Sequence, residues 1–288
     1  MGYSGRYHAT SLIAVFLALG VGMVIGAALG GDTIDNTRED LERSLTGNLQ
    51  DARERADELN AELGRANEFS SRVYPVLVRD QLRGRRIGVL ALGELPEDVL
   101  GAIEDALEPT GAQLVAVGVV REPADLQGLA DDLSKTRFAD LASNPDTQTA
   151  LGVGVGRQLV LGGTLLEPVR SNLFSRASGN FGGLDGVIVV REQPQDMEPT
   201  QRTVAGRIES GLASGITATR APAVGVEESD AEHSSISFYG GNDLASVDDI
   251  DLVAGRLAAV FALLGAEGDF GVKGSADRLL PDLLPPRR

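Results

Sequence analysis

The sequence predicts an α/β protein with three parts: a single N-terminal transmembrane helix, a coiled-coil stalk, and a Rossmann-like three-layer α/β domain with a mostly parallel sheet. Three observations lead to this expectation: an uncharged apolar run near the N-terminus, a heptad repeat after it, and alternating strand-like and helix-like stretches over the remaining chain. The expected parts are a cytoplasmic tail at 1–9, the transmembrane helix at 10–30, the stalk at 31–73, the α/β domain at 74–267 and a C-terminal tail at 268–288.

The apolar run holds no charged residue from Thr10 to Leu29. About 20 helical residues, each rising about 1.5 Å, span the roughly 30 Å hydrocarbon core of a bilayer. A cleaved export signal is the alternative, because Gly26-Ala27-Ala28 offers small residues at which a peptidase could cut. The apolar core of such a signal is usually shorter, about 7–15 residues. We therefore expect the segment to be retained as an anchor.

The charges that flank this run predict its orientation. Arg6 precedes it, whereas acidic residues such as Asp32 and Asp35 follow it. Positively charged flanks stay on the cytoplasmic side. We therefore expect a single-pass cell-membrane protein with a cytoplasmic N-terminus and an extracytoplasmic bulk.

Three glycines in the apolar run, Gly22, Gly26 and Gly30, recur at intervals of four. They line one helix face with residues small enough for a second membrane helix to approach closely, which indicates dimerisation. The alternative is that glycine is simply common in membrane helices.

The segment after the apolar run carries the pattern of a coiled coil. Apolar residues alternate spacings of four and three, and the leucines among them are Leu45, Leu49, Leu59 and Leu63. Alanines fill the other three seam positions and two glycines interrupt the helix, so this seam alone predicts weak association. The alternative is a single amphipathic helix that lies on its own globular domain. We favour a homodimer, because one parallel pair would satisfy both the glycine repeat and the seam.

From Pro75 onward the pattern predicts alternating strands and helices. A strand, a helix and a strand over about 35 residues form a right-handed parallel unit. A capping box formed by Ser246 and Asp249 predicts the start of the last helix. The expected strands lie at 85–92, 113–120, 185–190, 221–227 and 235–239, and the expected helices at 96–112, 200–212 and 247–264, with further helix within 125–163.

The composition restricts the partners of this chain. Its 26 lysines and arginines face 42 acidic residues, a formal net charge of −16. This balance disfavours nucleic acid and anionic lipid surfaces. The chain has no cysteine and therefore no thiolate for redox or soft-metal chemistry.

Ligands of doubly wound sheets bind at the carboxyl ends of strands, so a site would be formed by the loops after Leu92 and Val190. Neither loop carries the Gly-x-Gly-x-x-Gly turn of nucleotide-binding sites. "GVGVG" at 152–156 has the wrong glycine spacing, and "GDFGVKGS" at 268–275 reverses the glycine–lysine order of a phosphate loop and is expected to be a tail. We therefore expect no cofactor.

Two polar features remain as candidates for chemistry. Asp248, Asp249 and Asp251 could bind a divalent cation, but the expected helix start explains them more simply, as charges that complement its dipole. His233 is the only histidine after the N-terminal tail, and without a nucleophile elbow it is expected to be a loop histidine. We assign no catalytic residue and no metal ligand, and expect a protein that is not an enzyme. A ligand-binding or hydrolytic domain is the second alternative.

Four stretches occur in order over nearly the whole chain: "YHATSLIAVFLALGVGMVIGAALGGD", "RRIGVLAL", "SVDDIDLVAGRLAAVFALL" and "GDFGVKGSADRLLP". In these stretches the chain resembles the actinobacterial MctB family, which carries the name copper transporter. The name implies copper transport or efflux, after a mycobacterial member described as an outer-membrane channel. A related branch, SteB, implies a membrane-anchored coiled-coil dimer that pairs with a second membrane protein, SteA, in cell-envelope and division control.

The residues themselves favour the second implication. Copper sites use thiolates, thioethers or imidazoles, and beyond the apolar run only Met197 and His233 supply them. A single membrane helix cannot enclose an aqueous channel. We therefore expect a membrane-anchored, dimeric cell-envelope scaffold that presents its α/β domain to a protein partner, such as a SteA-like membrane protein. A copper transport component is the alternative.

Overall fold

The computed structural model describes residues 5–282, and within the first helix it describes the side chains of residues 11–28 and 44–78. The chain divides into two compact units, one up to Ala66 and one from Asn67 onward.

The first unit is helical throughout its described residues. Helix α1 runs over Gly5–Val78, and its last turns belong to the second unit. Within it, Ser11–Ala28 has a mean hydropathy of 2.4 and none of this window is buried, so by length and composition it could cross a membrane. The predicted N-terminal apolar helix is therefore present.

The glycines and leucines that were predicted to pack against a second chain are exposed within the described part of this chain. A Cβ added at Gly22 or Gly26 would meet no atom within 4 Å, and the surroundings of Gly30 lie outside the described side chains. The seam leucines Leu45, Leu49, Leu59 and Leu63 are 52–60% exposed. The coiled coil and the dimer stay predictions.

The second unit is a mixed α/β fold built on one seven-stranded sheet within the described residues. The strand order is β3-β2-β1-β4-β5-β6-β7, and all pairs are parallel except β2 with β3. The mostly parallel sheet was predicted. The strands are β1 Arg86–Gly93, β2 Gln113–Val120, β3 Phe174–Gly179, β4 Gly186–Glu192, β5 Ala223–Val226, β6 Ala245–Val247 and β7 Asp269–Phe270.

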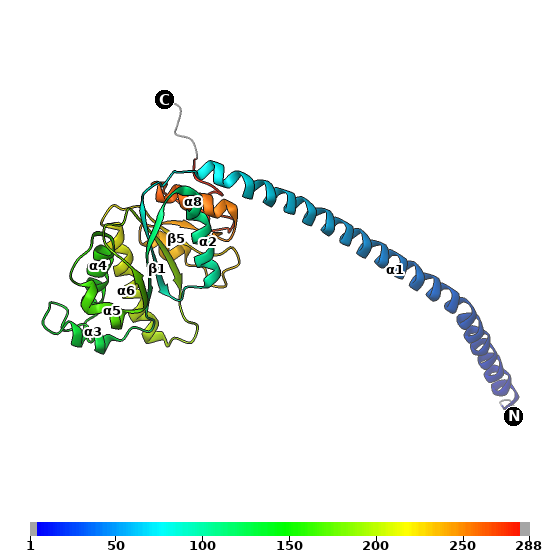
Figure 1. Cartoon of the computed structure of the whole chain (residues 1–288). Helices are drawn as coiled ribbons and strands as arrows, with labels where there is room; N and C mark the ends of the chain where they lie inside the picture. Colours follow the sequence, from blue (N-terminus) through cyan, green and yellow to red (C-terminus); the bar gives the residue numbers. More distant parts are fainter. Residues whose placement is uncertain (1–4, 283–288) are drawn as a thin grey trace. The chain divides into compact units, whose positions relative to one another are not determined.

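Helices cover both faces of this sheet (Figure 1). Successive strand residues alternate between two apolar clusters: Val89 and Ala91 of β1 face α2 and α8, whereas Leu90 and Leu92 face α3 to α7. Both faces are buried, which explains the nearly continuous apolar runs of β1, β2 and β4. The helices are α2 Glu97–Leu107, α3 Leu126–Asp132, α4 Pro145–Leu161, α5 Leu166–Leu173, α6 Pro199–Thr217, α7 Ile236–Gly241 and α8 Val253–Leu263, with a short 3-10 turn at Glu108–Thr110.

The glycine-rich stretch at 152–156 lies inside α4 and serves helix packing. A Cβ on Gly152 or Gly156 would lie closer than 3.0 Å to backbone atoms of α6, and the same holds in reverse for Gly211 and Gly215 of α6 toward α4. Two helix backbones therefore touch along a row of glycines. This contact accounts for the stretch without any bound phosphate.

Two predicted elements are wrong. The stretch 235–239, predicted as a strand, enters the helix α7, in which Ile236 and Tyr239 bury the same face. The last helix does not start at Val247, because Ser246 and Val247 form strand β6 and α8 begins only at Val253. The hydroxyl of Ser246 donates to Asp269 (2.6 Å), so it does not cap a helix.

The predicted boundary between 267 and 268 lies too early. Strand β7 pairs with β6, Phe270 is fully buried, and a further bridge joins Phe270 to Arg278. The segment that was expected to be a tail therefore completes the edge of the sheet. The fold also contains β3 and α5, which the sequence pattern did not predict.

Candidate functional site

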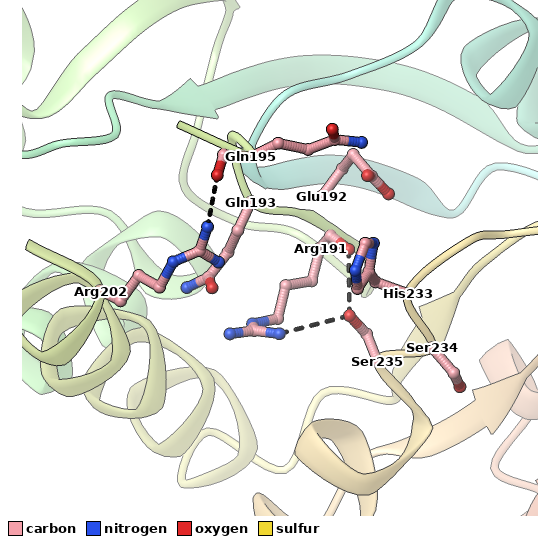
Figure 2. A pocket seen from close by; sticks show the side chains of 8 residues that line it. All are labelled: Arg191, Glu192, Gln193, Gln195, Arg202, His233, Ser234 and Ser235. Carbon is pink, nitrogen blue, oxygen red and sulfur yellow. Dashed lines mark hydrogen bonds between the residues drawn. The ribbon is translucent and has the colours of Figure 1, made fainter. Parts of the chain in front are cut away.

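A polar pocket of about 400 Å³ lies beyond the carboxyl ends of β4 and β5. Strand β4, the loop that follows it, α6 and the loop before α7 contribute its walls (Figure 2). The loop after Val190 was predicted as a place for a ligand site, and the pocket lies there. Its lining residues are Arg191, Glu192, Gln193, Gln195, Arg202, His233, Ser234 and Ser235.

Arg191, at the end of β4, is held in one orientation. Its side-chain Nε forms an ion pair with Oε2 of Glu209 on α6 (3.0 Å), and the Glu209 side chain is buried. Its guanidinium lies 4.6 Å from the ring centroid of Phe238, and Nη1 donates to Ser235 (3.4 Å). A charged group that is fixed before a ligand arrives loses little conformational entropy on binding.

The backbone of Arg191 is fixed as well. Its N–H donates to the hydroxyl of Tyr239 (2.9 Å), and its carbonyl accepts from the Ser235 hydroxyl (3.1 Å). The same Tyr239 hydroxyl donates to the carbonyl of Val226 on β5 (3.1 Å). Burial raises the pKa of Tyr239 well above its ordinary value, so the hydroxyl keeps its proton. Tyr239 therefore ties the ends of β4 and β5 together beneath the pocket.

A second carboxyl group, Glu122, lies behind the ion pair. Both of its oxygens are buried and receive no N–H or O–H donor from the described residues. Burial, followed by the negative charge of Glu209, raises the pKa of Glu122 to about 9, while Arg191 opposes the shift. Glu122 is therefore a neutral acid near pH 7. The positive charge of Arg191 is therefore balanced by the carboxylate of Glu209 alone, and Glu122 adds no second negative charge.

Arg202, in the first turns of α6, forms the opposite side of the pocket. Its Nε donates to the carbonyl of Met197 (3.1 Å), and its Nη2 donates to those of Pro194 (3.4 Å) and Gln195 (2.7 Å). These bonds wrap the loop after β4 around the guanidinium. Arg202 is thereby fixed by backbone oxygens alone, without an acidic partner among the described residues.

Glu192 and His233 complete the lining. Burial and the nearby Glu94 raise the pKa of Glu192, whereas His233 lowers it. The N–H of Glu94 donates to the carbonyl of Glu192 (2.8 Å), and Gly93 turns with a φ of 94° where an added Cβ would strike that carbonyl. The loops after β1 and β4, which the sequence indicated as places for a ligand site, therefore touch each other.

A second polar cluster lies beside the pocket and fixes the C-terminal segment. Nζ of Lys273 forms an ion pair with Oε1 of the buried Glu227 (2.7 Å), at the end of β5. Asp248 accepts from the N–H groups of Val272 (2.8 Å) and Lys273 (3.1 Å). Each of these charged groups has a structural partner.

The acidic cluster that the sequence singled out is a loop, not the first turn of a helix. Asp251 accepts from the N–H and hydroxyl of Ser229 (2.7 Å each). Asp249 is fully buried, and its carboxyl oxygens have no hydrogen-bond partner among the described residues. Burial, followed by the charges of Asp248 and Asp251, raises its pKa to about 7. No group of three or more His, Cys, Asp or Glu within the described residues is arranged to hold a metal ion.

Sequence reasoning found the position of the pocket but missed its central residue. An arginine at the end of an otherwise apolar strand, "VIVVRE", is the signal that could have indicated Arg191. His233 is an exposed loop residue, as predicted.

Comparisons with known proteins identify the relatives of this chain. The family model described as "Copper transport outer membrane protein, MctB" matches residues 3–281. Proteins named "Copper transporter MctB" from Mycobacterium bovis and Mycobacterium tuberculosis are 25% identical over 293 residues, which cover 90% of this chain and 91% of the relatives. The chain therefore belongs to the MctB family.

Proposed function

We propose that this MctB-family protein is a single-span membrane protein of the cell envelope, whose stalk pairs with a second copy and whose α/β unit is presented to a protein partner outside the cytoplasm. The observation that carries the proposal is the row of exposed leucines at heptad spacing on the helix that continues from the apolar span. Exposed apolar rows on a continuous helix are the signature of a partner helix.

The energetics favour a weak, membrane-assisted pair. Burying one leucine contributes roughly 1.5–3 kcal/mol, whereas the alanines at the other seam positions add little. Loss of translational and rotational freedom opposes association by at least several kcal/mol in solution. Anchoring two helices in one membrane raises their effective concentration, so the seam needs less intrinsic affinity.

Cysteine crosslinking in membranes tests the pairing directly, because the chain has no cysteine of its own. We expect Leu59→Cys and Leu63→Cys to give a covalent dimer with a short bismaleimide linker, since seam positions face each other in a parallel pair. Ala61→Cys, on the opposite helix face, is the matched control and should remain monomeric. Equal crosslinking at all three positions would show random collisions and exclude a specific seam.

The presentation of the α/β unit has a separate test. Protease added to intact cells or spheroplasts should remove the α/β unit if the bulk of the chain is extracytoplasmic, and should spare it if the bulk is cytoplasmic. Crosslinking followed by purification should recover a membrane protein with the wild type, and this protein should be lost in a Leu59→Asp, Leu63→Asp variant.

Copper transport is the second candidate, favoured by the family description and by the names of the relatives. The donor chemistry of the described residues opposes a dedicated copper site. Met197 is buried and does not line the pocket, and His233 stands there without a second soft ligand. A deletion strain tests this candidate. If the strain is copper-sensitive, and the wild type rescues it but a Met197→Ala, His233→Ala variant does not, copper transport is the function and the scaffold proposal is wrong.

A further inference from the structure

We propose that the pocket around Arg191 binds a small molecule with one carboxylate that also carries a hydroxyl or ammonium group, such as an α-hydroxy or α-amino acid. This site goes beyond the proposed scaffold and does not depend on self-association. Four observations carry it: two fixed guanidinium groups, the charge balance of the lining, an unpaired acceptor, and the size of the pocket.

Each guanidinium is fixed through some of its nitrogens and keeps a terminal nitrogen available. Arg191 is held through Nε and Nη1, and its Nη2 makes no hydrogen bond to another described residue. Arg202 is held through Nε and Nη2, and its Nη1 is likewise unbonded within the described part of the chain. Both side chains line the same pocket (Figure 2). A carboxylate is the group that two such N–H donors recognise with favourable geometry.

The charge balance of the lining favours a ligand with a single negatively charged group. Glu209 already balances Arg191, and the neutral Glu122 adds no further negative charge. Arg202 contributes one unpaired positive charge, and Glu192 places a carboxyl group in the same lining. The carboxyl group of Glu192 would therefore repel a doubly charged phosphate more strongly than it repels a single carboxylate.

Glu192 is the complementary acceptor. Its side chain is half-buried and forms no hydrogen bond or ion pair with another described residue. A half-buried carboxyl group without a donor is unfavourable. A hydroxyl or ammonium group on the ligand would supply that donor, which is why a plain carboxylate such as acetate fits the site less well.

The size and polarity of the pocket agree with this ligand class. Its volume of about 400 Å³ lies near the lower end of the range for small-molecule sites, roughly 300–1,000 Å³. Polar side chains dominate its lining, so it suits a small polar ligand and disfavours an apolar one. The position beyond the carboxyl ends of parallel strands is where open α/β sheets bind ligands.

Ligand-observed saturation-transfer NMR on the full chain in nanodiscs tests the site with L-lactate, L-alanine, acetate and inorganic phosphate as probes. We expect L-lactate and L-alanine to bind at millimolar concentration, more tightly than acetate or phosphate. Arg202→Gln should weaken both by about tenfold, because a charge-assisted hydrogen bond is lost. Glu192→Gln should weaken L-alanine most and should strengthen acetate.

Arg170→Gln is the control, since Arg170 is an exposed arginine that lines a different hollow. It should leave all four affinities unchanged. If Arg202→Gln lowers the unfolding temperature, its weaker binding could come from a disturbed fold. The Glu192→Gln variant then tests the site, because it should weaken the binding of L-alanine and strengthen that of acetate. The site assignment is overturned if neither L-lactate nor L-alanine binds, if phosphate binds more tightly than both, or if Arg170→Gln weakens binding as much as Arg202→Gln does.

Discussion

The ammonium group of Lys273 lies 2.7 Å from Oε1 of Glu227, although 46 residues separate them in the chain. Lys273 also donates to the carbonyl of Glu228 (2.7 Å), and Ser234 donates to the same Glu227 oxygen (2.8 Å). One ion pair thus joins the end of β5, the loop that lines the pocket and the segment after β7. Lys273 is one of only two lysines in the sequence, and it stands in the stretch "GDFGVKGS" by which the chain resembles its family.

Removing the ammonium group should destabilise the α/β unit. Lys273→Met leaves Glu227 buried without its cation, and breaking a buried pair in this way costs about 3–5 kcal/mol. Urea unfolding of the full chain in detergent, followed by circular dichroism, measures the loss. Lys135→Met is the control at the other, exposed lysine and should change the free energy of unfolding by less than about 0.5 kcal/mol. Equal stability of the two variants would contradict the assigned role of the pair.

Glu122 should make the stability of the protein depend on pH. Its pKa is raised from 4.5 to about 9 in the folded state, so the folded state holds this proton more tightly than the unfolded state does. The resulting stabilisation is complete below about pH 4.5 and is lost as pH rises toward about 9, by at most about 1.4 kcal/mol per pH unit. Glu122→Gln keeps the shape and cannot ionise, so its stability relative to the wild type should increase across this window.

Urea unfolding at pH 5, 7 and 9 distinguishes the two proteins. The exposed helical residue Glu104 provides the control, since Glu104→Gln should give a pH dependence parallel to that of the wild type. Parallel curves for Glu122→Gln would mean that Glu122 is ionised in the folded protein.

The contact between α4 and α6 should not tolerate a methyl group. Gly156→Ala places a Cβ against the backbone of Leu212, and overpacking of this kind costs about 1–3 kcal/mol. Gly206→Ala lies on α6 with no atom within 4 Å of the added Cβ. It should be neutral or stabilising by up to about 1 kcal/mol, because alanine favours helix more than glycine does. Thermal unfolding of both variants checks the contrast.

The glycines of the apolar span make a prediction about the membrane. Gly26→Ile should reduce self-association in a bacterial reporter of membrane-helix pairing, since a bulky side chain keeps the backbones apart. Gly20→Ile is the control and should leave the signal unchanged, because Gly20 lies on the helix face away from Gly22 and Gly26. An undiminished signal for Gly26→Ile would remove the membrane helix from the dimer interface.

The sequence predicted correctly those elements whose residue pattern is compatible with only one kind of structure. Strand β2 was predicted at 113–120, its observed bounds, because a continuous run of apolar, β-branched residues fits a doubly covered strand. Strand β3 was missed because it is an antiparallel edge strand with Phe174 as its only buried residue. The pattern at Ser246 and Asp249 fits both a capping box and a strand followed by a buried acidic loop, and the tertiary contact with Asp269 decides between them.

The candidate site was predictable in place but not in composition. Open α/β sheets bind ligands at the carboxyl ends of their strands, so the loop after Val190 was indicated as a place where a site would lie. The environment of Arg191 depends on Glu122, Glu209 and Tyr239, which come from three other elements. No local pattern connects residues that meet only in the folded unit.

The pairing of Lys273 with Glu227 also joins two segments that are made at different times during synthesis. Glu227 and Asp248 are synthesised before Val272 and Lys273, so both carboxylates lack these donors until the C-terminal segment has been made. Strand β7 pairs with β6 across only 23 residues, from Ser246 to Asp269, so this pairing forms as soon as the C-terminal segment has been made. Without β7 the edge of β6 has no strand beside it, and an unpaired strand edge is prone to pair with another chain.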